Sequence, residues 1–197
     1  MKIAIISDIH SNYIALNSAL NDINKQNIEE IFCLGDLVGY APYPDKVFPI
    51  LKDPKSNIKI IMGNYDEAIA LEKDNCGWGY TDITSSKMGK ISFEWTRTHT
   101  SKANKEWIKK LPREIRLKTK DKNILMVHGS PTSLSERVDL LNDNQIIVMM
   151  EKADANVLFC AHTHMPYHKI VGSNRIVNSG ECRKTKNWKP TSKLRYH

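Results

Sequence analysis

The sequence predicts an α/β fold in which short, mostly parallel strands alternate with helices. Short runs of β-branched and other apolar residues recur along the chain, and the stretches between the early runs have the apolar spacing of a helix. Strands that are separated by helices pair in parallel. A chain of 197 residues with 41% hydrophobic and 26% charged residues can form one globular domain, which excludes a disordered chain or a membrane bundle.

The first part of the chain predicts two strand–helix units followed by a third strand. Residues 2–6 are a β-branched run that predicts a strand. A helix over 13–26 is predicted from three apolar residues at i, i+4 and i+7 and from a polar residue that can cap it: Leu16, Leu20, Ile23, and Ser11 or Asn12. The pattern then repeats as a strand at 30–33, a short helix at 45–52 perturbed by Pro49, and a strand at 58–62.

Residues 66–112 have a different texture and predict a helical insert over one end of the sheet. Met88, Ile91 and Trp95 share one face of its first helix, and Trp95 is expected in the core. A second helix has Trp107, Ile108 and Leu111 on its apolar side, with Ser101 as cap and Pro112 as stop. Trp78 and Tyr80, in a glycine-rich loop that precedes both helices, are a candidate substrate contact.

The second part of the chain again reads as strands, with one helix. The expected elements are strands at 114–117 and 123–127, a helix at 143–152, and strands at 156–160, 167–171 and 175–177, the last two separated by a Gly-Ser-Asn turn. We therefore expect one domain over 1–182, with the helical insert within it.

Charge is concentrated in residues 183–197, which form a basic C-terminal tail with six Lys or Arg and no acid. Without these, 29 − 6 = 23 basic residues face 22 acidic ones. Nucleic-acid binding is therefore not expected except through the tail. The four cysteines form no C-x-x-C pair, and the N-terminal residues lack the pattern of a signal or membrane segment. We expect a cytoplasmic protein that does not contact membranes.

Residues able to bind a metal ion follow five of the predicted strands. They are Asp8 and His10, Asp36, Asn64, His128, and His162 and His164. Taken singly, each has an ordinary explanation as a turn residue, a helix cap or a surface histidine. Because the carboxyl ends of strands in an open α/β sheet form the site, the set together predicts one metal centre.

The ligand types indicate the chemistry of that centre. Seven donors exceed the needs of one ion, so we expect two divalent ions that share a bridging carboxylate, with Asp36 as the candidate. Imidazole and carboxylate without thiolate favour Mn, Fe, Ni or Zn over Ca. Two such ions about 3.5–4 Å apart can hold a hydroxide nucleophile between them and neutralise phosphoryl oxygens, which is the chemistry of phosphoester hydrolysis.

The motifs D8-x-H10, G35-D36, G63-N64, H128-G and H162-x-H164 together resemble the signature of the calcineurin-like metallophosphoesterases. SDIHSN, HGSP and HTHMP are similar to the compact prokaryotic branch with YfcE-type phosphodiesterases and diadenosine-tetraphosphatase-like proteins. The resemblance implies a four-layer α/β/β/α sandwich with Mn as the usual metal. It also implies one ion held by Asp8, His10, Asp36 and His164, and a second held by Asp36, Asn64, His128 and His162.

The resemblance further implies that Asn12 lies near the substrate phosphate. This chain departs from the family pattern at two places. Tyr65 stands where the family has a histidine that assists the leaving group, and tyrosine is a weaker acid at neutral pH. Tyrosine can still donate a hydrogen bond, so we expect Tyr65 to take part in catalysis with Asp66 orienting it, although Asp66 could equally cap a helix. The chain also departs from the family after residue 180, and a missing strand there would expose a sheet edge and invite a homo-oligomer.

These observations predict a hydrolase of phosphodiesters, phosphoanhydrides or phosphomonoesters, with a phosphorylated small molecule or a nucleotide, such as a dinucleoside polyphosphate, as substrate. The alternative is a catalytically weak protein-interaction scaffold, because the retromer subunit of this fold is known chiefly as such a platform. The complete ligand set favours the enzyme. Only the tyrosine at position 65 favours the scaffold.

Overall fold

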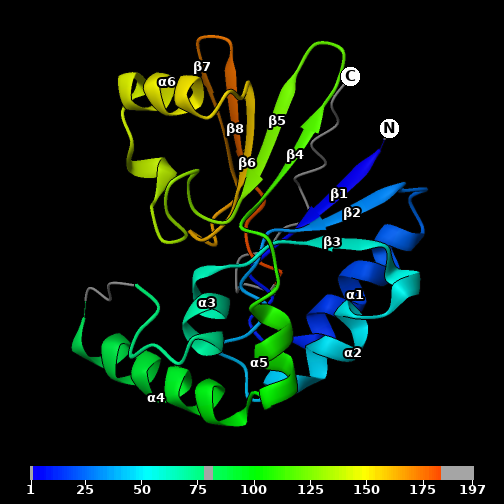
Figure 1. Cartoon of the computed structure of the whole chain (residues 1–197), viewed down its shortest axis with the longest axis vertical. Coiled ribbons are helices and arrows are strands. Elements are labelled where there is room, and N and C mark those ends of the chain that lie inside the picture. Colours follow the sequence, from blue (N-terminus) through cyan, green and yellow to red (C-terminus); the bar gives the residue numbers. More distant parts are fainter. Residues whose placement is uncertain (1, 78–81, 183–197) are drawn as a thin grey trace.

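A computed structural model describes residues 2–77 and 82–182, and its strands form two sheets that meet at an angle (Figure 1). The first sheet is parallel, in the order β1-β2-β3: β1 (Ile3–Ile6), β2 (Glu30–Cys33) and β3 (Ile58–Ile60). The second sheet has the order β4-β5-β6-β8-β7: β4 (Glu114–Lys118), β5 (Asn123–Val127), β6 (Val157–Cys160), β7 (Tyr167–Val171) and β8 (Asn174–Asn178).

The second sheet is mixed, with its parallel strands in the middle. β5, β6 and β8 run parallel, while β4 and β7 pair antiparallel at the two edges. The predicted Gly-Ser-Asn turn joins β7 to β8, and β8 returns to pair with β6. The carboxyl ends of β5 and β6 therefore point to the same edge of the sheet, as those of β1, β2 and β3 do in the first sheet.

Helices cover the outer faces of the two sheets. They are α1 (Tyr13–Asn24), α2 (Phe48–Leu51), α3 (Asn64–Ala70), α4 (Ile83–His99), α5 (Lys102–Ile108) and α6 (Asp143–Lys152), with 3-10 turns at Pro44–Val47, Pro54–Ser56 and Val138–Leu140. The helix predicted at 45–52 is a 3-10 turn followed by one α-helical turn, because Pro49 lacks the N–H that a continuous helix would need at that position.

Three apolar clusters show how the layers are packed. Phe32, Leu34, Ile61, Met126 and Ala161 fill the space between the two sheets. A second cluster lies between the first sheet and α1–α5, and a third lies between the second sheet and α6. This order of layers confirms the α/β/β/α sandwich. None of the helices in residues 2–77 and 82–182 has the length and apolar character that a bilayer-crossing segment needs.

The stretch predicted as a helical insert contains α4 and α5, which lie beside α3 below the first sheet (Figure 1). The prediction that Trp95 is in the core is wrong, because its side chain is 46% exposed and Met88 and Ile91 are also exposed. α4 instead buries Gly89 and Phe93.

Two contacts hold Trp95 at the surface. Its indole N–H donates to the Pro42 carbonyl at 2.9 Å, and its ring stacks on His99. Trp107, on the second helix of this stretch, packs against the apolar cluster as predicted. Trp78 and Tyr80, the candidate substrate contact, and the basic tail at 183–197 lie outside the described residues.

The layer between the sheets should be sensitive to loss of volume. Phe32 is fully buried there, so Phe32→Ala leaves a cavity and should lower the free energy of unfolding by about 3–5 kcal/mol, measured by urea denaturation. Ile83→Ala, at an exposed position on α4, is the control and should change it by less than about 0.5 kcal/mol. Equal effects of the two substitutions would contradict this packing.

Candidate metal centre

The loops that follow β1 and β2 are held together by their backbones. The amides of Asp8, His10 and Ser11 donate to the carbonyls of residues 35, 36 and 37, at 3.0, 2.9 and 2.8 Å. This ladder continues the strand pairing past the end of the sheet. It fixes the positions of Asp8, His10 and Asp36 relative to one another.

Most of the predicted ligand residues have left-handed backbone conformations, which side chains other than glycine adopt at a cost. Their φ angles lie between 47° and 65°, at Asp8, His10, Asp36, His162 and His164. Such conformations persist only where the surrounding structure enforces them, and they turn side chains from adjacent loops toward one point.

The loop after β3 is brought close to the loop after β2 by two glycines. Gly35 has a φ of +88°, and a Cβ on it would lie 2.4 Å from the amide nitrogen of Gly63. Only glycine fits this contact, which places Asn64 beside Asp36.

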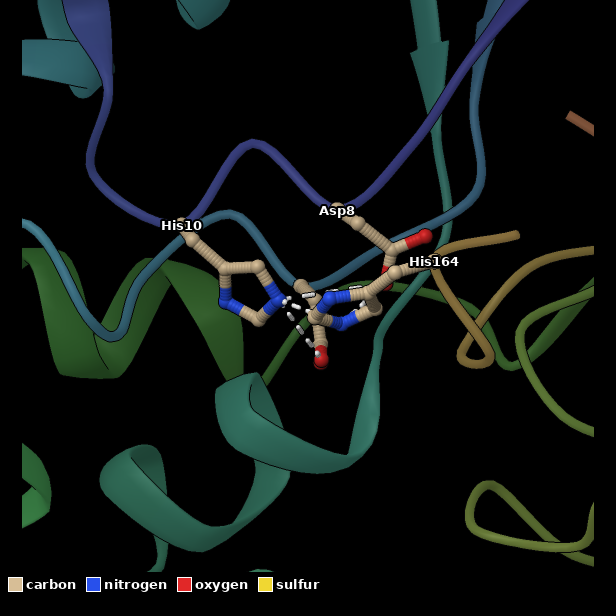
Figure 2. A group of neighbouring side chains, drawn as sticks. Asp8, His10 and His164 are labelled. Atoms are coloured by element: carbon tan, nitrogen blue, oxygen red, sulfur yellow. Dashed lines mark hydrogen bonds and ion pairs between the residues drawn. The ribbon is translucent and has the colours of Figure 1, made fainter. Parts of the chain in front are cut away.

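Asp8, His10, Asp36 and His164 form the first group of ligands (Figure 2). Their ligand atoms all lie within 4.8 Å of one another. The Nε2 atoms of His10 and His164 are 3.0 Å apart, and His164 Nε2 lies 3.5 Å from Asp8 Oδ1. Asp8 Oδ1 is buried without a hydrogen-bond partner among the described residues.

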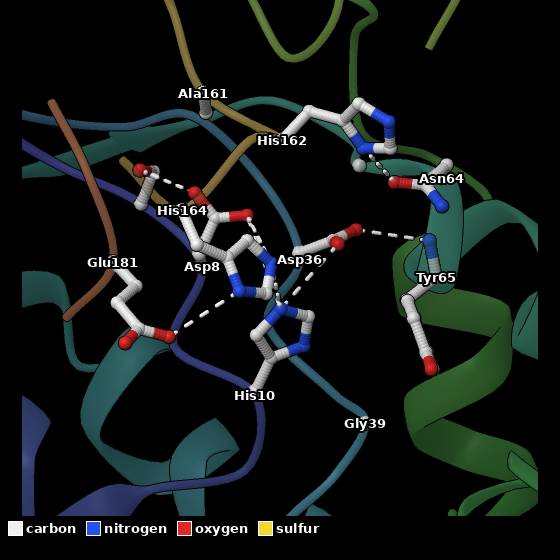
Figure 3. A network of polar contacts seen from close by, with 12 residues as sticks. Asp8, His10, Asp36, Gly39, Asn64, Tyr65, Ala161, His162, His164 and Glu181 are labelled. Carbon is white, nitrogen blue, oxygen red and sulfur yellow. Dashed lines mark hydrogen bonds and ion pairs between the residues drawn. The ribbon is translucent and has the colours of Figure 1, made fainter. Parts of the chain in front are cut away.

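Asn64, His128 and His162 form a second group. Figure 3 shows Asn64 and His162 on the other side of Asp36 from His10. The amide oxygen of Asn64 lies 2.9 Å from His128 Nε2 and 3.0 Å from His162 Nδ1. Asp36 faces both groups, with Oδ1 3.4 Å from His128 Nε2 and Oδ2 3.7 Å from His10 Nε2. The structure therefore brings all seven predicted ligand residues together.

Backbone carbonyls orient two of the histidines. His10 Nδ1 lies 3.1 Å from the Val38 carbonyl, and His128 Nδ1 lies 2.6 Å from the Leu34 carbonyl. Because a carbonyl only accepts, Nδ1 carries the proton and each ring presents Nε2 to the centre. The His128 contact also ties the second sheet to the first.

Burial and close charges shift the pKa values of these groups. Burial favours the uncharged forms, and it raises the pKa of Asp8 to about 6 and lowers that of His10 to about 3. For His128, burial opposes the charged form, but the Asp36 carboxylate outweighs it and raises the pKa to about 9. The pKa of Asp36 is held below its usual range by His128, against the effect of burial.

These residues fit a bound metal ion. Four buried or half-buried carboxylate and imidazole groups converge within one coordination sphere, and one buried carboxylate oxygen accepts no hydrogen bond from the residues that the structure describes. The donors are imidazole and oxygen with no thiolate, a set that suits first-row transition metals.

Tyr65 and Asp66 have contacts that differ from the predicted catalytic pair. The Tyr65 backbone amide donates to Asp36 Oδ1 at 2.9 Å, while its side chain is 2% exposed and points away from Asp36 (Figure 3). The ring packs edge-on against His10 and lies over Gly39, where a Cβ would meet it at 2.7 Å.

The carboxylate of Asp66 binds the backbone instead of orienting the Tyr65 hydroxyl. It accepts from the amide of Gly63 at 3.0 Å and from those of Leu37 and Val38 at 2.9 and 3.3 Å. Asp66 thus has the helix-cap role that the sequence left open, and it also fixes the loop that follows Asp36. Asn12 likewise caps α1, accepting from the amide of Ala15 at 3.0 Å.

Sequence reasoning missed two residues that support the ligands. The Ser7 hydroxyl lies 2.8 Å from Asp8 Oδ2, and the Glu181 carboxylate lies 3.3 Å from His164 Nδ1. Ser7 is part of the quoted SDIHSN motif, so its position was a signal. Glu181 lies seventeen positions after His164, beyond two further strands, and nothing in the sequence pattern connects the two residues.

The layered fold and the clustered imidazoles and carboxylates are those of a metal-binding hydrolase. A family model described as the calcineurin-like phosphoesterase superfamily domain matches residues 1–196, and the chain belongs to this superfamily. The chain is 31% identical over 179 residues to the uncharacterized protein MJ0912 of Methanocaldococcus jannaschii, covering 91% of this chain and 69% of that protein.

Solved structures show the same fold. The hypothetical protein PH1004 from Pyrococcus horikoshii has a TM-score of 0.75 at 24% identity, over 91% of this chain and 76% of that one. A metallophosphoesterase from Sphaerobacter thermophilus has a TM-score of 0.66 at 26% identity, over 92% and 77%. E. coli YfcE, described as a phosphoesterase, shares the fold at 18% identity and a TM-score of 0.53, over 96% of this chain and 85% of that one.

The fold is also shared by Vps29. A Vps29 variant from Entamoeba histolytica has a TM-score of 0.52 at 16% identity, over 92% of this chain and 74% of that one. The fold alone therefore does not separate an enzyme from a scaffold, and the ligand residues must do so.

Metal binding should strengthen as pH rises from about 6 to about 9. The raised pKa of His128 keeps its proton on the metal-free protein at neutral pH, and Asp8 loses its proton only near pH 6. A metal ion must displace these protons, so low pH opposes binding. Calorimetric titration with Mn²⁺ in buffers of different ionisation enthalpy should show proton release at pH 7. A pH-independent affinity without proton release would contradict these shifts.

Proposed function

We propose that this protein is a dinuclear-metal phosphoesterase. The observation that supports it most is the place of Asp36, whose two carboxylate oxygens face two separate groups of ligands. A carboxylate in that position can bridge two ions. Asp8, His10 and His164 complete one set of ligands, and Asn64, His128 and His162 complete the other. Mn is the metal we propose first, with Fe, Ni or Zn as alternatives.

The residues around the ligands supply the rigidity that such a site needs. Two divalent ions held by these residues would supply an activated water as nucleophile and would neutralise charge on the phosphoryl oxygens. The Tyr65 amide orients Asp36, and the carbonyls of Leu34 and Val38 orient His128 and His10. The ligands are thus held in place before substrate arrives, so little reorganisation is needed during the reaction.

The position of the Tyr65 hydroxyl bears on which class of substrate the site favours. Its hydroxyl points away from Asp36 into a buried aromatic cluster, so this position offers no acid to protonate a leaving oxygen (Figure 3). Esters whose leaving groups need little protonation are favoured under that condition. We therefore propose phosphodiesters and phosphoanhydrides, including nucleotides and dinucleoside polyphosphates, as substrates in preference to alkyl monoesters.

We also propose a cytoplasmic location, consistent with four free cysteines.

Asp36→Asn should abolish most of the activity. The substitution keeps a side-chain oxygen near the Tyr65 amide but removes the charge that would bridge the ions. Metal ions contribute several kcal/mol to phosphoryl transfer, and about 1.4 kcal/mol is a factor of ten, so we expect kcat/KM for bis(p-nitrophenyl) phosphate with Mn²⁺ to fall by at least about a hundredfold. Asp139→Asn, which removes a surface partner of Arg137, is the matched control.

A chelator should give the same loss, and added Mn²⁺ should reverse it. If the Asp36→Asn protein and the unmodified protein hydrolysed equally slowly with every metal, the phosphoesterase proposal would fail. The scaffold alternative would then account for the fold.

Leaving-group chemistry should govern substrate choice. Because a general acid contributes about 10²–10⁴-fold, we expect kcat/KM for bis(p-nitrophenyl) phosphate or a dinucleoside polyphosphate to exceed that for glycerol phosphate by at least about a hundredfold. Tyr65→His, which restores the family residue, should narrow this ratio if the imidazole reaches the leaving oxygen. Alkyl monoesters as the best substrates would disprove the preference.

A further inference from the structure

Glu181 lies in a segment that is anchored on both sides. Before it, the Asn178 side chain donates to the Ala161 carbonyl at 2.6 Å and accepts from the Gly180 amide at 2.9 Å. After it, the Cys182 amide donates to the Ser7 carbonyl at 2.8 Å. Residues 178–182 therefore run between the loop that carries His164 and the loop that carries Asp8, and Glu181 has a fixed position there.

The Glu181 side chain is buried against the metal centre. It is 4% exposed, and its carboxylate oxygen lies 3.3 Å from His164 Nδ1 (Figure 3). The opposite ring nitrogen of His164, Nε2, faces Asp8 and His10. The carboxylate and the metal ligands thus lie on opposite sides of one imidazole ring.

The three histidines that present Nε2 to the centre have different supports. His10 and His128 donate to neutral backbone carbonyls, whereas His164 faces a carboxylate. A carboxylate behind a ligating imidazole fixes its tautomer and makes the ring a stronger donor. Among the residues that the structure describes, His164 is the one of these three rings with a carboxylate in that position.

We propose that Glu181 is a positioning residue for metal binding, which holds His164 in its Nε2-ligating form and tightens the ion bound by Asp8, His10, Asp36 and His164. This inference rests on the proposed function, because it assumes that these residues bind an ion. It goes further by predicting that the two ions differ in affinity and that the difference depends on a residue outside the ligand set.

The test compares Glu181→Gln with the unmodified protein in metal binding, independently of activity. Glutamine keeps an acceptor near His164 Nδ1 but removes the charge. Supporting residues of this kind change metal affinity by about 10–100-fold, so we expect calorimetric titration with Mn²⁺ to show one of two bound equivalents weakened by that factor. The visible absorption of the Co²⁺-loaded protein should also change, because the donor strength of one ligand changes.

Glu30→Gln is the matched control, since it removes one carboxylate that pairs with Lys59 and lies at the start of β2, at the opposite end of the strand from the loop that carries Asp36. It should leave Mn²⁺ affinity and the Co²⁺ spectrum unchanged. Glu181→Asp keeps the charge but places it one methylene further from His164, so its Mn²⁺ affinity should lie between that of the unmodified protein and that of Glu181→Gln. It decides the question if the glutamine variant does not fold.

The outcomes separate this inference from the proposed function. If the unmodified protein binds two ions and hydrolyses its substrates but Glu181→Gln binds both with unchanged affinity and spectrum, only the role of Glu181 is disproved. Unchanged affinity in Glu181→Asp would disprove it in the same way if the glutamine variant does not fold. If the unmodified protein binds no divalent ion, both proposals fail.

Discussion

The centre depends on one buried carboxylate, that of Asp36. It accepts a hydrogen bond from the backbone of α3 and faces one histidine from the first sheet and another from the second. A buried charge is costly unless hydrogen bonds and opposite charges surround it. The pairing of Asp36 with His128 meets that requirement without metal, and the position between two ligand groups suits it to metal. The loops after four strands must therefore meet at this carboxylate.

Two kinds of support hold that arrangement. Backbone ladders join the loops that carry Asp8, His10 and Asp36, and close contact between Gly35 and Gly63 sets the distance to Asn64. Asp66 contributes in a different way, because its carboxylate binds three amides of two loops. These contacts enforce the left-handed conformations of the ligand residues, which would otherwise be strained.

The sequence was informative where a residue's role depended on its place at the end of a strand. Asp8 and Asp36 follow neighbouring parallel strands, so the topology of the first sheet alone brings them to one edge. His128 follows a strand of the second sheet and reaches them through the packing of the two sheets. Roles that depend on side-chain direction were not accessible in this way. Tyr65 has the right place in the sequence for catalysis, but its ring fills a buried space over Gly39.

The sequence pattern did not predict which side of α4 is buried or that Glu181 contacts His164, because both depend on tertiary contacts. The apolar residues of α4 predicted a buried face, yet the helix buries the side with Gly89, Phe93 and Thr96. Glu181 supports a histidine seventeen positions earlier in the chain, and that pairing exists only because residues 178–182 are anchored beside the loop after β6. The contact is a consequence of tertiary structure, which no local pattern records.

The contacts that cross between the sheets also determine when the centre can form. The pairs His10–His164, Leu34–His128 and Asn64–His162 are separated by 154, 94 and 98 positions in the chain. Contacts of such long range close late, because much of the chain must already be ordered before they are favourable. A newly made chain therefore has to dock its two halves before the metal site is complete. Metal binding would then stabilise a molecule that is already folded, and it would not nucleate folding.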